Sequence, residues 1–118
     1  MSFTQAVRSA FGNYATFSGR ASRSAFWWFQ LFCILTIPLP LFIDLTWFSG
    51  LPVFQAIFEL PLVVPALALS VRRLHDIDRS GWWLLLVLIP ILGWIPLFYF
   101  TIQPSQESSN RFGSSPIA

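Results

Sequence analysis

A short polar segment between two long apolar runs constrains the fold more than any other feature of this sequence. It extends from Ser70 to Trp83 and holds three of the seven arginines, two of the five acidic residues and the only histidine. The residues on either side, 60–71 and 82–102, are almost wholly apolar. This pattern is typical of an aqueous link between two membrane-spanning helices.

The overall composition argues against a soluble domain. Hydrophobic residues make up 55% of the 118 residues and charged residues only 10%, whereas a soluble domain is about 25% charged. The net charge of +2 is scattered along the chain, which excludes a nucleic-acid binder with a clustered basic face. Cys33 is the only cysteine, so no internal disulfide is possible.

We therefore predict an all-α membrane protein: three transmembrane helices preceded by a short amphipathic interfacial helix, in a single domain of residues 1–118. The expected order is a cytoplasmic amphipathic segment at 1–23, spans at 25–43, 51–71 and 81–102, a cytoplasmic link at 72–80, a loop at 44–50 and a tail at 103–118. The second and third spans contain about 20 residues, which is enough to cross a ~30 Å hydrocarbon core. Four prolines, Pro38, Pro40, Pro61 and Pro65, are expected to break or bend the first two helices.

The first twelve residues contain an apolar stripe at helical spacing, formed by Phe3, Ala6, Val7, Ala10 and Phe11. Ser2 is a suitable N-cap, with Gln5 at the capping-box position, and Gly12 with Asn13 is a stop signal. Two interpretations remain open. The helix lies flat in the membrane interface, or it packs on the protein's own cytoplasmic loop.

The arginines predict the topology. Arg8, Arg20 and Arg23 precede the first span and three more occupy the 72–80 link, whereas the 44–50 loop has none. The positive-inside rule therefore places the N-terminus and the link in the cytoplasm, and three spans then place the tail outside. A cytoplasmic tail would instead indicate a re-entrant third segment that turns at Pro90 and Gly93.

Several motifs resemble those of one family. Residues 72–83 read Arg-Arg-Leu-His-Asp-Ile-Asp-Arg-Ser-Gly-Trp-Trp, which resembles the signature of the domain-of-unknown-function 805 family of small bacterial inner-membrane proteins. Residues 19–28, the Ile89-Pro90 pair with Gly93, and the segment 110–116 are also similar to it. The resemblance covers nearly the whole chain and implies location in the bacterial inner (plasma) membrane as a multi-pass protein. It implies no biochemical activity.

Enzymatic or metal chemistry is not expected. His75, Asp76 and Asp78 offer suitable metal ligands, but their spacing matches no closed zinc pattern. His75 and Asp78 lie at i, i+3 on one helical face and would suit an acid–base pair, yet no nucleophile motif or phosphate-binding loop accompanies them. We predict no catalytic residue, no metal site and no cofactor.

The arginines of the link have two interpretations. Arg72 and Arg73 can each pair with Asp76, at i, i+4 and i, i+3. Alternatively, with Arg79 they form a corner that faces lipid phosphates, which a guanidinium binds in bidentate fashion. The candidate lipid- or partner-binding residues are Arg20, Arg23, Arg72, Arg73, His75, Asp76, Asp78, Arg79 and Trp82.

Three polar side chains are expected inside the membrane: Gln30, Gln55 and Glu59. The favoured interpretation of Glu59 is a carboxyl group that is kept neutral by desolvation or that hydrogen-bonds Gln55 or Gln30. The alternative is a proton or cation site in an oligomeric transporter or channel. The sequence thus predicts a non-enzymatic inner-membrane component whose arginine-rich cytoplasmic face interacts with anionic lipid headgroups or with a partner protein. A membrane protein partner or a homo-oligomer is compatible with this prediction, and nucleic acid is not expected. The alternative is an oligomeric small transporter or channel that uses Glu59.

Overall fold

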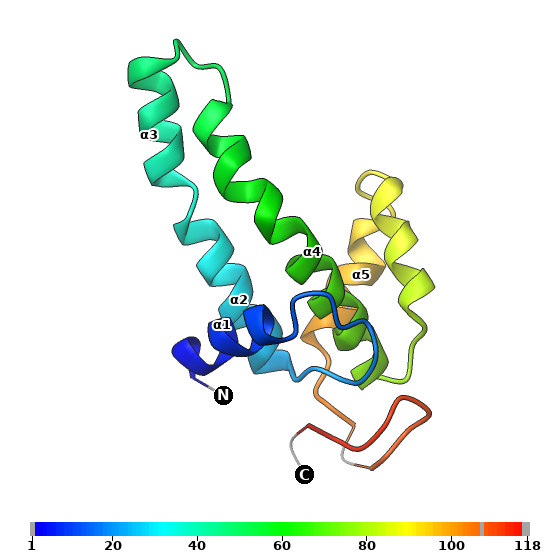
Figure 1. The fold of residues 1–118 in the computed structure, drawn as a ribbon. Helices are drawn as coiled ribbons and strands as arrows, with labels where there is room; N and C mark the ends of the chain where they lie inside the picture. Colours follow the sequence, from blue (N-terminus) through cyan, green and yellow to red (C-terminus); the bar gives the residue numbers. More distant parts are fainter. Residues whose placement is uncertain (1, 107, 117–118) are drawn as a thin grey trace.

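The structure is a computed structural model that describes residues 2–106 and 108–116. The prediction of an all-α fold is confirmed. The helices in chain order are α1 (Phe3–Gly12), α2 (Arg23–Leu35), α3 (Pro38–Trp47), α4 (Val53–Asp76), the 3-10 helix η1 (Gly81–Leu88) and α5 (Trp94–Ile102). In Figure 1, α2 and α3 follow one another as one long arm, and α4 returns beside them as the second arm.

Two stretches are long and apolar enough to cross a membrane, Arg23–Trp47 and Val53–Asp76. Only 17% and 22% of their most apolar windows are buried, so these helices do not form the core of a soluble fold. Large apolar side chains such as Phe42 and Leu60 instead point outward. A lipid environment accommodates this surface without polar cover.

The N-terminal helix begins and ends as its sequence predicts. The Ser2 hydroxyl accepts from the Gln5 amide, and the Gln5 side chain accepts from the Ser2 amide, which completes the capping box. The apolar stripe packs on α2, since Phe3 contacts Trp28 edge to face and Phe11 contacts the ring of Phe32. The helix therefore rests on α2 rather than on the cytoplasmic loop, and it lies across the two arms in Figure 1.

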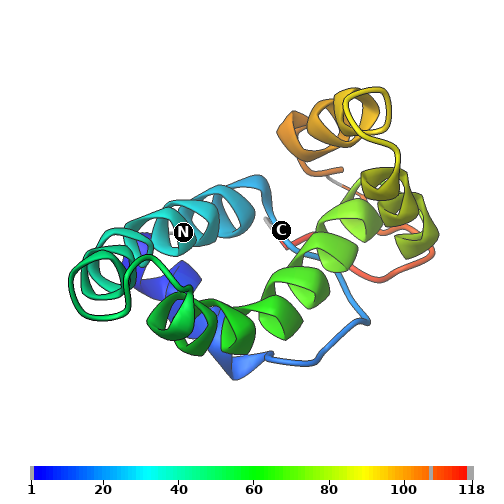
Figure 2. The same cartoon turned by 90° about the horizontal axis from the view of Figure 1, so that it is seen from above.

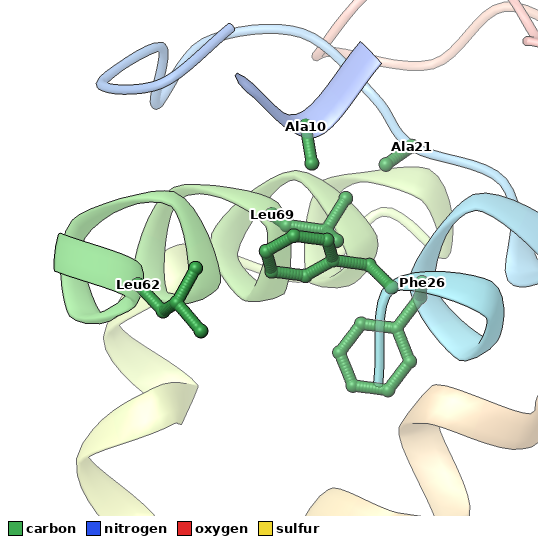
Figure 3. Packing of buried hydrophobic residues seen from close by; sticks show 6 residues of the cluster. Ala10, Ala21, Phe26, Leu62 and Leu69 are labelled. Atoms are coloured by element: carbon green, nitrogen blue, oxygen red, sulfur yellow. The ribbon is translucent and has the colours of Figure 1, made fainter. Parts of the chain in front are cut away.

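The small core lies where α1, α2 and α4 meet. Phe26 and Phe29 of α2 face Leu62 and Leu69 of α4, and Ala10 of α1 closes the cluster from above (Figure 3). Small alanines allow α1 to approach the two arms closely. The core thus ties the N-terminal helix to the arginine-rich ends of α2 and α4.

The first arm is interrupted where its prolines predicted. α2 ends at Leu35, and α3 starts at Pro38, which occupies a first-turn position that needs no amide donor. The expected loop at 44–50 is shorter than predicted, because α3 continues to Trp47. Asp44 is therefore helical and buried, and its two carboxylate oxygens accept from the amides of Phe54 and Gln55 at 2.8 and 2.9 Å. This carboxylate caps α4, whose own N-cap position holds a proline.

The structure does not show the expected third span, 81–102, as one helix. These residues form two short helices, η1 and α5, joined by a turn at 89–93. The start of η1 lies against Val71 of α4, and the end of α5 returns to the same place, because the Thr101 carbonyl accepts from Arg73 Nε at 3.2 Å. The segment is thus a hairpin, as in the re-entrant alternative, and in Figure 2 it lies beside the C-terminal end of α4.

The hairpin brings the tail back toward α4. Residues 103–106 and 108–116 lie at the end of α4 and near the loop between α1 and α2, rather than at the far end of the arms (Figure 1). The physical reason is a set of arginine bonds to tail carbonyl groups, described below, that no local sequence pattern reveals.

Candidate binding site

The last turns of α4 place buried polar residues at the end of the molecule where α4, the start of α2 and the tail meet. We call Arg20, Arg72, Arg73, His75 and Asp76 the polar corner. Arg20 comes from the loop after α1 and the other four from α4, and all five side chains are largely or wholly withdrawn from solvent. The corner lies beside the N-terminus of α2, because the Ala21 amide donates to the Arg72 carbonyl at 3.0 Å.

Asp76 is the electrostatic centre of the polar corner. Its side chain is 0% exposed and accepts from Arg73 Nη1 at 2.8 Å and from Arg20 Nε at 3.1 Å. The Ser105 hydroxyl also donates to this carboxylate. The predicted Arg73–Asp76 pair is therefore confirmed, whereas no contact joins Asp76 to the side chain of Arg72 among the described residues. A buried charge pair of this kind is tolerated because its remaining hydrogen-bonding capacity is filled.

Arg20 holds the tail in place. Beyond Asp76, its guanidinium donates to the carbonyl groups of Gln106, Ser108 and Gly113. Its side chain is 1% exposed, so it faces the protein interior rather than the lipid phosphates expected for it. Arg73 likewise donates to the carbonyls of Thr101 and Gln103. Two guanidiniums thus bind the tail to α4 by its backbone.

His75 has a packing role in the polar corner. Its ring stacks on Phe112 with centroids 3.9 Å apart and planes 2° from parallel, and its Nδ1 lies 2.9 Å from the Gly19 carbonyl. The Asn110 side chain donates to the His75 carbonyl. The proposed acid–base partner, Asp78, instead pairs with Arg111 at 3.3 Å. Within the residues that the structure describes, no three His, Cys, Asp or Glu side chains converge as metal ligands.

Two exposed arginines, Arg23 and Arg79, lie around the polar corner, and we call them the rim. Arg23 donates to the Ile102 carbonyl from an exposed position. Arg79 lies over the rings of Trp83 and Phe100, at 5.3 and 5.0 Å from their centroids. Trp82 is 79% exposed, which suits the interfacial position predicted for it. These guanidiniums remain accessible to an external anion, unlike Arg20 and Arg73.

The polar residues within the arms are arranged differently from expectation. Glu59 contacts the hydroxyl of Thr36 at 3.1 Å, at the break between α2 and α3, and not Gln55 or Gln30. Gln55 lies in the first turn of α4, where Asp44 caps its amide, and Gln30 lines an apolar cavity between α2, α4 and α5. Thr36 was missed because only the helix break before Pro38 brings its hydroxyl within reach.

The Tyr14 hydroxyl replaces a helical hydrogen bond that a proline in α4 cannot donate. Pro65 has no amide, so the Pro61 carbonyl four residues earlier lacks its usual helical donor. The Tyr14 hydroxyl donates to that carbonyl. The loop after α1 is therefore tied to α4 at both Tyr14 and Ala21.

Two apolar arms, a short apolar hairpin and a closed arginine-rich end define a small helical membrane protein. The family model described as "Protein of unknown function (DUF805)" matches residues 14–114, and the chain belongs to this family. The matched segment begins at Tyr14 and includes the whole polar corner.

Curated relatives agree with this class. The chain is 40% identical over 108 residues to the inner membrane protein YhaI of Escherichia coli strain K12, covering 92% of each chain. It is 39% identical over 108 residues to the inner membrane protein YhaH of the same organism, covering 88% of this chain and 89% of the relative. No solved structure matches the chain. The protein is thus an inner-membrane protein of a family for which no activity is indicated.

Proposed function

We propose that this protein is a non-enzymatic component of the bacterial inner membrane that binds anionic lipid headgroups with its arginine-rich end, with both termini in the cytoplasm. The observation that carries the proposal is the distribution of charge. Every arginine lies in α1, the loop after it, the first turn of α2, the end of α4 with the link behind it, or the tail. The opposite end, 36–52, contains none.

This distribution supports an orientation. Positively charged segments remain in the cytoplasm during insertion, and the tail with Arg111 packs at the same end as Arg20. In Figure 1 the two ends of the drawn chain accordingly lie at the same end of the arms. We therefore place two full spans across the bilayer and both termini on its cytoplasmic side.

The dimensions of the hairpin support a re-entrant position. Eight residues of 3-10 helix at about 2.0 Å each reach about 16 Å, and nine residues of α5 at about 1.5 Å each reach about 13 Å. Both lengths are about half of the ~30 Å hydrocarbon core. The outward-facing side chains near the turn are apolar, with Leu88 and Leu92 both 75% exposed, so the hairpin suits the cytoplasmic half of the bilayer.

The exposed rim is suited to lipid headgroups. Arg23 and Arg79 are accessible, and a cation near an anionic membrane surface contributes about 1 kcal/mol. Trp82 and Trp83 follow at the depth where aromatic residues favour the interface. Arg79 is positioned by its stacking on Trp83, so its guanidinium is held where the chain enters the bilayer.

Replacing both Arg23 and Arg79 by Ala should weaken retention of anionic lipid by about 30-fold, since two contributions of about 1 kcal/mol are lost. Native mass spectrometry of the protein in mild detergent measures bound phosphatidylglycerol and cardiolipin. The matched control is Arg111→Ala, which removes an exposed guanidinium already paired with Asp78 and should retain lipid like the wild type. Equal retention in all three proteins would contradict lipid binding by the rim.

One observation favours the second candidate, an oligomeric transporter or channel. Glu59 lies beside the break between α2 and α3, and broken helices with a nearby carboxylate occur at transporter ion sites. Replacing Glu59 by Gln separates the two functions: a transporter loses its activity, whereas lipid retention by the rim is unchanged.

A further inference from the structure

Arg72 differs from the other two arginines of the polar corner because two of its guanidinium nitrogens have no partner among the described residues. The residue is 6% exposed, and its Nε and Nη2 atoms are buried without a hydrogen-bond partner in the described part of the chain. Asp76 is already shared by Arg20 and Arg73. The corner therefore buries three guanidiniums against one carboxylate. A buried, unpaired charge of this kind is costly unless an anion completes it.

A cavity adjoins this unpaired side chain. Its volume is about 280 Å³, and it lies between α1, the start of α2 and the end of α4. Arg72 and Leu69 line it from α4, Ser9 and Ala10 from α1, and Ser22 and Ser24 from the start of α2. No acidic residue contributes to the lining among the described residues. Ala10 and Leu69, which both line the cavity, face one another in Figure 3.

The N-terminus of α2 adds a second source of positive potential. Ser22 is the N-cap of this 13-residue helix, and its hydroxyl accepts from the Ala25 amide. The cavity is lined by Ser22, Ser24 and Ala25, which are the cap and first turn of the helix. The helix dipole therefore directs its positive end into the cavity, as at known anion sites.

We propose that this cavity binds a phosphate group, with Arg72 as its principal ligand and the first turn of α2 as its second. A guanidinium binds phosphate oxygens through its N–H groups, and Arg72 lines the cavity. The volume is close to that of the smallest ligand pockets, ~300 Å³, so it suits a phosphate with a small substituent. That phosphate belongs either to a lipid headgroup or to a free phosphate ester. The lipid case rests on the proposed function, whereas the phosphate site does not.

Thermal unfolding of the delipidated protein in a neutral detergent tests the site with three probes. These are sodium phosphate against sodium chloride at equal ionic strength, glycerol 3-phosphate, and phosphatidylglycerol against phosphatidylcholine in mixed micelles. At least one phosphate probe should raise the unfolding temperature of the wild type. Arg72→Gln should reduce the affinity for that probe at least tenfold, and Arg72→Lys should restore only part of it. Arg111→Gln removes an exposed arginine outside the cavity that already pairs with Asp78, and this variant should respond like the wild type.

The pattern of responses identifies the ligand. Protection by phosphatidylglycerol alone indicates a lipid headgroup, and protection by sodium phosphate or glycerol 3-phosphate indicates a free ester. Without any probe, Arg72→Gln should unfold at or above the wild-type temperature, because it removes an unpaired buried charge. If Arg72→Gln fails to fold, Ser9→Leu fills the cavity while keeping Arg72 and should abolish the same response. An equal response in Arg72→Gln and the wild type, or no response of the wild type to any probe, overturns the phosphate site. Unchanged lipid retention on removing Arg23 and Arg79 would contradict the proposed function but would leave the test of the phosphate site unaffected.

Discussion

Replacing Asp76 by Asn should destabilise the protein by about 3–5 kcal/mol, because it leaves Arg20 and Arg73 buried without a counter-charge. The variant keeps the size of the side chain, so the loss reports charge rather than packing. The tail should separate from α4 at the same time, since the arginines that hold its carbonyl groups lose their anchor. A large fall in the unfolding temperature in mild detergent, with faster proteolysis after residue 103, is the expected result.

The neighbouring acid provides the control. Asp78→Asn removes an ion pair with Arg111 whose side chains are 43% and 60% exposed, and exposed pairs contribute about 0–1 kcal/mol. This variant should therefore unfold close to the wild-type temperature. Similar losses for the two variants would show that the buried pair with Asp76 is not the main stabilising element of the polar corner.

Replacing Gly93 by Ala should disrupt the hairpin. A Cβ atom at this position would overlap the Leu86 carbonyl oxygen and would lie 2.8 Å from that of Ile89. Backbone atoms cannot move aside as a flexible side chain does, so the turn between η1 and α5 must open. Overpacking of this kind costs about 1–3 kcal/mol or more. We expect a lower unfolding temperature and a changed environment of Trp94, because its indole nitrogen would lose the hydrogen bond that it now donates to the Val87 carbonyl.

Gly12 is the matched glycine for this experiment. It ends α1, and a Cβ there meets nothing within 4 Å, so Gly12→Ala should leave stability unchanged or slightly raised. If Gly93→Ala unfolds like Gly12→Ala, with no change at Trp94, the close turn of the hairpin is not as described.

Local sequence signals predicted the local structure of this protein. The capping box at Ser2 is confirmed, since it depends on residues within a few positions of one another. Pro38 likewise marks the break in the first arm. The Arg73–Asp76 pair follows from helical spacing alone.

The hairpin could not be distinguished from a span by length and hydropathy. Residues 81–102 are long and apolar enough to cross a bilayer, and only the turn residues Pro90 and Gly93 indicated another course. The role of Asp44 was missed for a related reason, because its partners lie ten residues ahead on a different helix. Pairing of Arg20 with the tail spans almost the whole chain, and nothing local in the sequence specifies it.

The position of the C-terminus tests the account most directly, because a third span and a re-entrant hairpin place it on opposite sides of the membrane. Green fluorescent protein and alkaline phosphatase are fused in turn after Gly50 and after Ala118. We predict phosphatase activity without fluorescence at Gly50, and fluorescence without phosphatase activity at Ala118. Phosphatase activity at both positions would contradict two spans with a re-entrant hairpin.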